Sequence, residues 1–245
     1  MAGAIKYSFK RYESKYFLSP IQYTAVLCGM RQYMKSDEYG KTTICNIYYD
    51  TDDWRLIRSS IEKPVYKEKL RVRSYGVPKN NGKVFVELKK KFSGVVYKRR
   101  ISADVQSANA FLENTVIRAN DAQIEKEIKW FQRFYKSKPK VFIAYDRVAY
   151  VGNEDSELRI TFDTNMRWRN TDLDLRCGDY GKPIIETDNI LMEIKIPGVC
   201  PLWLSHLLSE IGTYPTSFSK YGTCYSEHLI KKEKTKNEKE ALCSA

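Results

Sequence analysis

Histidine is scarce in this sequence, since only His206 and His228 occur among 245 residues. Both fall in predicted helices. With so few histidines, the sequence gives little support for a His-ligated metal site or a His-based catalytic triad. The six cysteines form no Cys-x-x-Cys pair and no regular framework, and therefore indicate neither a zinc site nor a disulfide scaffold. We expect reduced, mostly buried thiols and a functional site built from other side chains.

Long apolar runs are also missing, and no stretch approaches the roughly 18 apolar residues of a membrane span. Lys6, Lys10 and Lys15 break up the start of the chain, which excludes the apolar core of a secretory signal. There is no internal repeat and no long Gly/Ser/Pro linker. We expect a cytoplasmic protein with one domain over residues 1–230 and a charged, disordered tail over residues 231–245.

A complete phosphate-binding loop motif is absent as well. The segment Gly76 to Lys83 (GVPKNNGK) has a superficial likeness to one. Its spacing is one residue too long, and Val84 stands where the motif requires a hydroxyl residue. The segment is better interpreted as a hairpin turn around Asn80, Asn81 and Gly82.

Positive charge, by contrast, is in excess, with 42 Lys and Arg against 30 Asp and Glu and a formal net charge of +12. Such a balance points to polyanionic partners, among which nucleic acid, an anionic membrane and a phosphate polymer all qualify. The 42% content of hydrophobic residues is enough for a sizeable core.

Several segments alternate apolar and charged residues with the period of two that is typical of β-strands. The split is clearest over residues 65–75 and 84–91, and it recurs over 157–163 and 192–196. Glu13 and Lys15 share one face near the start of the chain. The charged faces carry Lys67, Lys69, Arg71 and Arg73, then Glu87, Lys89 and Lys91, then Glu157, Arg159, Thr161 and Asp163, and finally Glu193 and Lys195.

These charged faces allow two interpretations. The simpler one is a half-buried antiparallel sheet whose charged side faces water. Rows of like charge on adjacent strands are destabilising, however, unless an anion neutralises them. Closing the strands into a barrel would put the charged faces into a lumen and the apolar faces outside, under the helices. We therefore predict an α+β fold, an antiparallel β-barrel tunnel with helices packed on the outside.

Helices are predicted in five places. The clearest begins with Ser19 as N-cap and Pro20 in the first turn. Two more are predicted over 105–118 and 121–135, the second with amphipathic spacing. Another follows Pro201, and the last follows Tyr221.

Seven short motifs appear in a specific order. They are ESKYFLS, KLRVR, FVELK, KRR, ELRITFDT, LMEIK and FSKY. In this order, over residues 8–226, they resemble the VTC domain of polyphosphate polymerases, within the triphosphate tunnel metalloenzyme (CYTH-like) superfamily. The fold that this resemblance implies is an antiparallel tunnel barrel, in agreement with the alternation of charge.

The resemblance also implies roles for individual residues. Lys15, Arg71, Arg73, Lys89 and Arg159 would be catalytic. Lys69, Lys98, Arg100, Arg147, Lys195 and Lys220 would bind phosphate groups. Glu193 would hold Mn²⁺ or Mg²⁺, with Glu13 and Glu87 as weaker candidates for the same metal.

The activity implied by the resemblance is metal-dependent transfer of the ATP γ-phosphoryl group to a growing polyphosphate chain. Hydrolases of the superfamily open with Glu-x-Glu-x-Lys, and here Arg11 replaces the first Glu, which favours the polymerase. ATP and polyphosphate are the expected partners. No specific nucleic acid and no transmembrane segment are expected, and a membrane-protein partner is left undefined. Two alternatives stay open: a triphosphate or polyphosphate hydrolase, and a non-enzymatic polyanion-binding module.

Overall fold

The computed structural model describes residues 12–93, 95–113, 122–185 and 188–230. Arg11 and the predicted tail lie outside these residues. The chain forms two compact units, and each is described by itself. Unit 1 comprises Met1–Thr42, Asp146–Asn165 and Glu186–Ser217, and unit 2 comprises Thr43–Tyr145, Met166–Ile185 and Phe218–Ala245.

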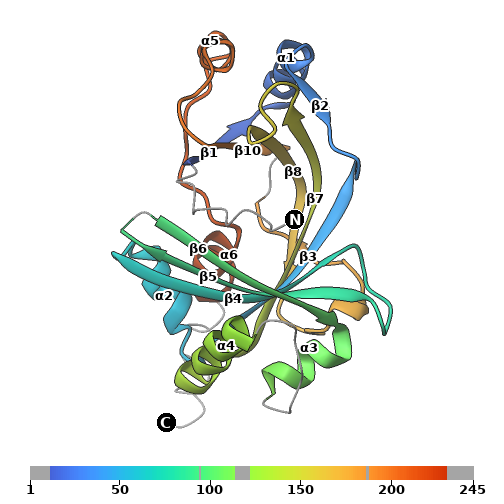
Figure 1. Cartoon of the computed structure of the whole chain (residues 1–245), viewed down its shortest axis with the longest axis vertical. Coiled ribbons are helices and arrows are strands. Elements are labelled where there is room, and N and C mark those ends of the chain that lie inside the picture. Colours follow the sequence, from blue (N-terminus) through green and yellow to red (C-terminus); the bar gives the residue numbers. More distant parts are fainter. Residues whose placement is uncertain (1–11, 94, 114–121, 186–187, 231–245) are drawn as a thin grey trace, which may run out of the picture. The chain divides into compact units, whose positions relative to one another are not determined.

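The described residues form a sheet of ten strands with helices, which confirms the predicted α+β class (Figure 1). The strand order is β1-β10-β8-β7-β3-β4-β5-β6, with β2 beside β7 and β9 beside β8. Within the described part of the chain no strand pairing joins β6 to β1, so the sheet is not closed as a strict barrel. The strands are β1 (Tyr12–Leu18), β2 (Met34–Ser36), β3 (Thr42–Asp50), β4 (Tyr66–Tyr75), β5 (Lys83–Phe92), β6 (Val95–Asp104), β7 (Lys138–Gly152), β8 (Arg159–Arg169), β9 (Lys182–Pro183) and β10 (Ile190–Ile196).

In unit 1, helices α1 (Pro20–Met30) and α5 (Leu202–Glu210) contribute to a core on the apolar face of β1, β10 and β8. Helix α1 begins where the sequence predicts. The Ser19 hydroxyl accepts a hydrogen bond from the Gln22 amide at 3.2 Å, and the Gln22 side chain accepts one from the Ser19 amide at 3.0 Å. Because Ile160 and Ile194 lie in this core, the charged residues of these strands lie on the opposite face.

In unit 2, strands β4, β5 and β6 form an antiparallel meander. Helices α3 (Val105–Leu112) and α4 (Ala122–Tyr135) lie on one side of it, as Figure 1 shows. Leu70, Val86 and Leu88 are buried in the core of this unit, as their alternation predicts. The predicted turn at residues 76–83 does join β4 to β5, where the Gly82 amide donates to the Lys79 carbonyl at 2.8 Å.

The helix predictions needed two corrections. Helix α3 ends at Leu112 rather than at residue 118, and residues 114–121 lie outside the described chain. Helix α2 (Arg55–Ile61) was not predicted. The buried carboxylate of Asp50 fixes its start by accepting hydrogen bonds from the Leu56 and Ile57 amides at 2.9 and 3.0 Å. This cap lies several residues before the helix, where a local capping pattern does not reveal it.

The last helix begins beside Tyr221, as predicted, with α6 (Lys220–Cys224) continuing into a π-helical turn, η2 (Tyr225–Leu229). A short 3₁₀ turn, η1 (Leu175–Cys177), precedes β9. The ring of His228 stacks on Trp168 with centroids 5.0 Å apart and lies 2.8 Å from the Ile184 carbonyl. These contacts indicate a structural role for His228, as expected.

The described cysteines are free thiols. Cys45 and Cys224 are buried, as expected, whereas Cys28 and Cys177 are exposed. In the described ranges no helix combines the length and the apolar character that a membrane crossing requires.

Candidate phosphate-binding site

One buried carboxylate in unit 2 gathers four of the predicted cationic residues. Glu87, only 1% exposed, lies on the charged face of β5. Its Oε2 accepts from Arg71 Nη2 at 2.7 Å, and its Oε1 accepts from Lys98 Nζ at 2.9 Å and Arg100 Nε at 2.7 Å. Arg73 Nε lies 3.9 Å from Oε2. We call Glu87, Arg71, Arg73, Lys98 and Arg100 the Glu87 cluster.

The register of three neighbouring strands explains this convergence. Arg71 of β4 is the partner of Glu87, and Glu87 is in turn the partner of Arg100 of β6. Side chains that lie directly opposite each other in an antiparallel pair are close enough to interact. One step along, Lys89 is the partner of both Lys69 and Lys98. The Arg99 side chain of the same KRR motif points to the helix side and pairs with Glu127 of α4 at 3.2 Å.

Neutral polar side chains, absent from the sequence prediction, hold the two arginines of β4. Arg73 Nε donates to Asn46 Oδ1 at 2.8 Å, and Arg73 Nη2 donates to Tyr145 Oη at 3.2 Å. The Asn46 amide is itself fixed, since Nδ2 donates to the Ile143 carbonyl at 3.1 Å. Arg71 Nη1 donates to Tyr48 Oη at 3.1 Å. These contacts orient both guanidinium groups before any ligand arrives.

The electrostatics of the cluster favour an added anion. Burial disfavours the charge on Glu87, yet Arg71, Arg73 and Lys98 hold the pKa of its carboxyl well below the usual range. Although burial would raise it, the pKa of Tyr48 is lowered because Arg71 and Arg73 lie beside its ring. Four cations share a single carboxylate in the cluster, an excess of three positive charges. Phosphate groups, like carboxylates, match the fork geometry of such arginines.

Three further predicted residues of unit 2 lie on or beside this face. Lys220 Nζ lies 4.4 Å from the centre of the Tyr145 ring, and Lys69 Nζ lies 3.4 Å from Ser219 Oγ. The Lys89 side chain is exposed to solvent. Tyr221 stacks on Tyr48 at 4.6 Å, and its hydroxyl donates to buried Asp50 at 2.8 Å. The structure therefore brings together all eight residues that the sequence prediction assigned to this unit.

A second charged cluster lies in unit 1. Arg147 holds Asp163 through two bonds, from Nε at 2.6 Å and from Nη2 at 2.7 Å, and also reaches Glu193 Oε2 at 3.1 Å. Lys15 Nζ lies 3.8 Å from Glu193 and 3.7 Å from Glu13. Acidic and basic side chains are nearly balanced here, unlike in the Glu87 cluster.

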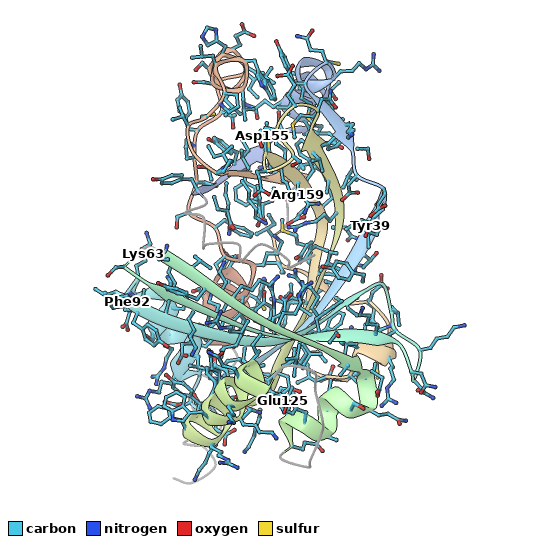
Figure 2. All side chains as sticks on the ribbon, viewed as in Figure 1. Tyr39, Lys63, Phe92, Glu125, Asp155 and Arg159 are labelled. Atoms are coloured by element: carbon cyan, nitrogen blue, oxygen red, sulfur yellow. The ribbon has the colours of Figure 1, made fainter. Side chains whose placement is uncertain are left out.

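Two predicted residues lie next to this second cluster. Lys195 is the strand partner of both Glu13 and Arg159. Arg159, labelled in Figure 2, reaches Asp37 at 3.7 Å and its side chain is 48% exposed. The structure thus groups Lys15, Arg147 and Glu193 in direct contact and leaves Arg159 at the edge.

The two units differ in how well they suit a divalent cation. No group of three or more His, Cys, Asp or Glu side chains that could hold a metal occurs within the described ranges. Glu13 and Glu193 are nevertheless near the same lysine, and the buried hydroxyl of Thr161, strand partner of Glu193, has no hydrogen-bond partner. A Mg²⁺-type ion needs only one or two carboxylates when phosphates supply other ligands, so these residues fit. Glu87, whose carboxylate contacts four cations where that of Glu193 contacts two, fits less well.

The residues of both clusters fall within the part of the chain that matches a known family. The VTC domain description matches residues 10–228. This chain belongs to the VTC domain family. The resemblance found in the sequence motifs is thereby confirmed.

Individual proteins are similar to this chain to different degrees. Subunit 4 of the vacuolar transporter chaperone complex of Schizosaccharomyces pombe is 26% identical over an alignment that spans 274 residues, gaps included. The alignment includes 90% of this chain and 37% of that protein, so the chain spans little more than a third of its relative. Among solved structures, a "putative adenylate cyclase" from Bacillus halodurans shares the fold with a TM-score of 0.51 at 13% identity, over 86% of this chain and 95% of the other. A similarly described protein from Vibrio parahaemolyticus has a TM-score of 0.48 at 10% identity, over 89% of this chain and 98% of the other.

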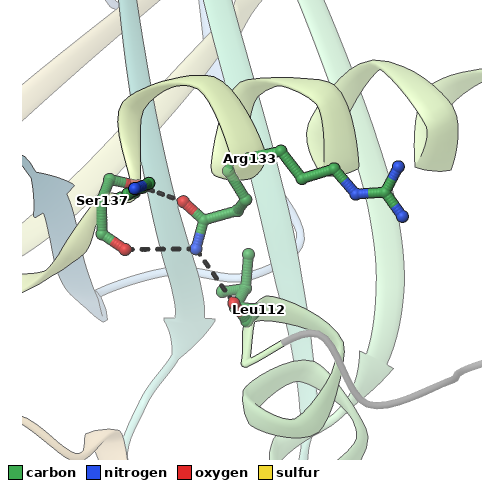
Figure 3. A pocket seen from close by; sticks show the side chains of 5 residues that line it. Leu112, Arg133 and Ser137 are labelled. Atoms are coloured by element: carbon green, nitrogen blue, oxygen red, sulfur yellow. Dashed lines mark hydrogen bonds between the residues drawn. The ribbon is translucent and has the colours of Figure 1, made fainter.

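A separate cavity of unit 2 has no comparable charge pattern. Figure 3 shows it between α3 and α4, where Leu112, Gln132, Arg133, Lys136 and Ser137 line it. The Gln132 amide donates to the carbonyls of Leu112 and Ser137 at 3.1 and 3.3 Å. These bonds link α4 to the end of α3 and to the residue before β7, so the polar groups that line the cavity have a structural role.

Lys98 gives the Glu87 cluster a predicted pH dependence. Burial lowers the pKa of Lys98 from 10.5 to about 8, although Glu87 opposes the shift. A group with a lowered pKa loses its proton earlier as the pH rises, so one positive charge disappears around pH 8. We expect the affinity for inorganic triphosphate to fall between about pH 7 and 9. Titration calorimetry at several pH values measures this, and Lys98→Arg should remove most of the fall. An equal fall in that variant would contradict the assignment to Lys98.

Proposed function

We propose that this VTC domain is an ATP-dependent polyphosphate polymerase. In the reaction, a terminal oxygen of the polyphosphate chain forms a bond to the γ-phosphorus of ATP, the bond from that phosphorus to the β,γ-bridging oxygen breaks, and ADP leaves. The observation that carries the proposal is the excess of three positive charges around Glu87, in which both β4 arginines are held by hydrogen bonds.

The arrangement suits phosphoryl transfer because this reaction needs little covalent chemistry from the protein. Positioning of the reactants and stabilisation of charge on the transferred oxygens supply most of the catalysis. Arg71 and Arg73 present oriented guanidinium groups, and Lys98 and Arg100 add charge from β6, on the other side of β5. The scarcity of histidine in the sequence is therefore no obstacle.

A divalent cation has a defined place in the proposal. Bound Mn²⁺ or Mg²⁺ would neutralise phosphate charge, with Glu193 and Glu13 as its protein ligands. Lys15 and Arg147, which contact the Glu193 carboxylate, would keep it oriented. We assign Glu87 a different role, as the anion that orients four cations, because its carboxylate contacts twice as many cations as that of Glu193.

The partners of the domain also belong to the proposal. ATP and polyphosphate are its substrates. The relative from Schizosaccharomyces pombe is a subunit of the vacuolar transporter chaperone complex. We extend this to a chain that works on the cytoplasmic side with other protein subunits.

One assay tests the proposed function. The purified protein is incubated with ATP and Mn²⁺, and polyphosphate, ADP and free orthophosphate are measured together. Polyphosphate with ADP is the expected result. Orthophosphate without polyphosphate would identify a hydrolase, and no product with retained triphosphate binding would identify a binding module. Glu193→Gln should abolish the Mn²⁺-dependent product, whereas Glu154→Gln, an exposed carboxylate, should leave it unchanged.

A further inference from the structure

An aromatic pair lies next to the Glu87 cluster on the same face of unit 2. Tyr75 ends strand β4 and is 52% exposed. Its ring meets Phe85 edge-on, with centroids 5.7 Å apart and planes at 80°. Phe85 is the strand partner of Arg73, and Tyr75 follows Arg73 by two residues, so both rings share the face of that arginine.

Arg100 connects this aromatic pair to the cluster. Its Nε donates to Glu87 at 2.7 Å, while Nη2 lies 3.4 Å from Tyr75 Oη. The same guanidinium stacks over the Phe85 ring at 4.4 Å from its centre. Lys83 also lies over the Phe85 ring, with Nζ 5.5 Å from its centre, so two cations already contact this ring. The ring of Tyr75 is the one that offers open aromatic surface.

The chemistry of this face changes along the strands. Tyr75 and Phe85 stand at one end, the arginines around Glu87 follow, and lysines continue to the other end, where Lys69 is the partner of Lys89 and Lys67 of Lys91. Tyr75 lies about 7 Å from Arg73 and about 13 Å from Arg71 along β4, at about 3.3 Å per residue. The face therefore offers a ring first and phosphate-binding groups after it.

A nucleoside triphosphate has the same order of chemistry, an aromatic base joined through a ribose to a chain of phosphates. Exposed aromatic rings beside cationic grooves bind bases by stacking, since every base has a π-face. At the other end this face presents the lysine pairs of β4 and β5, the kind of charge that a bare phosphate chain requires. The other tyrosines that contact the arginines, Tyr48 and Tyr145, are buried and therefore lack a free face.

We propose that Tyr75, backed by Phe85, is the nucleobase-stacking site of this domain and sets its preference for nucleoside triphosphates over inorganic triphosphate. This inference rests on the proposed function, because it places the base of the ATP substrate. It adds a ligand-binding residue whose contact is with the base rather than the phosphates. Stacking tolerates different bases, so GTP should bind at Tyr75 as ATP does.

The test compares two ligands that differ in the base. Titration calorimetry with ATP and with inorganic tripolyphosphate is carried out on the full chain and on Tyr75→Ala. We expect Tyr75→Ala to weaken ATP binding about tenfold and to leave tripolyphosphate binding unchanged. Tyr75→Phe, which keeps the ring and loses the hydroxyl near Arg100, should retain the ATP affinity. Tyr97→Ala, an exposed tyrosine on the helix side of β6, is the matched control and should bind both ligands normally.

Each other outcome overturns a specific claim. If Tyr75→Ala weakens both ligands equally, Tyr75 supports the cluster and the stacking site is wrong. If Tyr75→Phe is as weak as Tyr75→Ala, the hydroxyl contact with Arg100 matters and not the ring. Unchanged ATP binding in Tyr75→Ala would likewise overturn the inference alone. If the unaltered protein binds neither ligand, the proposed function fails together with this inference.

Discussion

Replacing Arg73 by Lys is expected to lower polyphosphate synthesis by at least about 100-fold while leaving the protein folded. Arg73 is one of the most buried cations of the Glu87 cluster, with 10% of its side chain exposed. Two of its nitrogens are fixed by Asn46 and Tyr145, so the guanidinium is held in one orientation. Lysine keeps the charge but has a single ammonium group and no fork. The Lys variant therefore lacks the oriented guanidinium N–H groups that would stabilise a transferred phosphoryl group.

The measurement is turnover at saturating ATP and Mn²⁺, accompanied by thermal unfolding of the same sample. Arg99→Lys is the matched control, since Arg99 belongs to the same β6 motif as Arg100 but faces α4 and pairs with Glu127. This control should retain normal turnover. Normal turnover in Arg73→Lys would remove Arg73 from the reaction. A large loss in both variants would show that the assay reports general damage to the sheet.

Strand faces were the part of the structure most open to prediction from the sequence. In β4 and β5 the period of two separates Leu70, Val86 and Leu88, which are buried, from Arg71 and Glu87 on the charged face. This succeeds because successive residues of a strand point to opposite sides whatever their neighbours are. The same rule assigned the faces of β8 and β10 correctly.

The contacts within the site were less predictable, because they depend on register and on distant residues. Alternation places Glu87 on the charged face, but only the pairing of β4, β5 and β6 shows that Arg71 and Arg100 flank it. The bonds from Arg73 to Asn46 and Tyr145 span 27 and 72 residues. A neutral Asn or Tyr in a strand gives no charge signal, so these residues were missed. The helix that Asp50 caps was missed for a similar reason.

The role of Glu87 leads to the second large prediction, which concerns stability. Glu87→Ala removes the one carboxylate that neutralises four cations while those cations stay in place. Breaking a buried ion pair by removing one partner typically costs about 3–5 kcal/mol of unfolding free energy. We expect a loss of about this size, measured by chemical denaturation. Glu87→Gln, which keeps the shape of the side chain, should lose the charge with less loss of packing.

Rescue by an added anion separates this role from metal binding. If Glu87 orients cations, saturating inorganic tripolyphosphate should raise the melting temperature of Glu87→Ala more than that of the unaltered protein, without added metal, because the added anion replaces the missing charge. A metal ligand would instead give a variant that phosphate alone does not rescue.

The pH dependence of the stability lost in Glu87→Ala follows from the lowered pKa of Glu87. A lowered carboxyl pKa gives stability that is present above the unfolded value of about 4.3 and is lost as the pH falls toward the folded value. The stability difference between the two proteins should therefore be constant from about pH 5.5 to 7.5 and shrink in stronger acid. A difference that persists unchanged in acid would show that packing, rather than charge, makes Glu87 important.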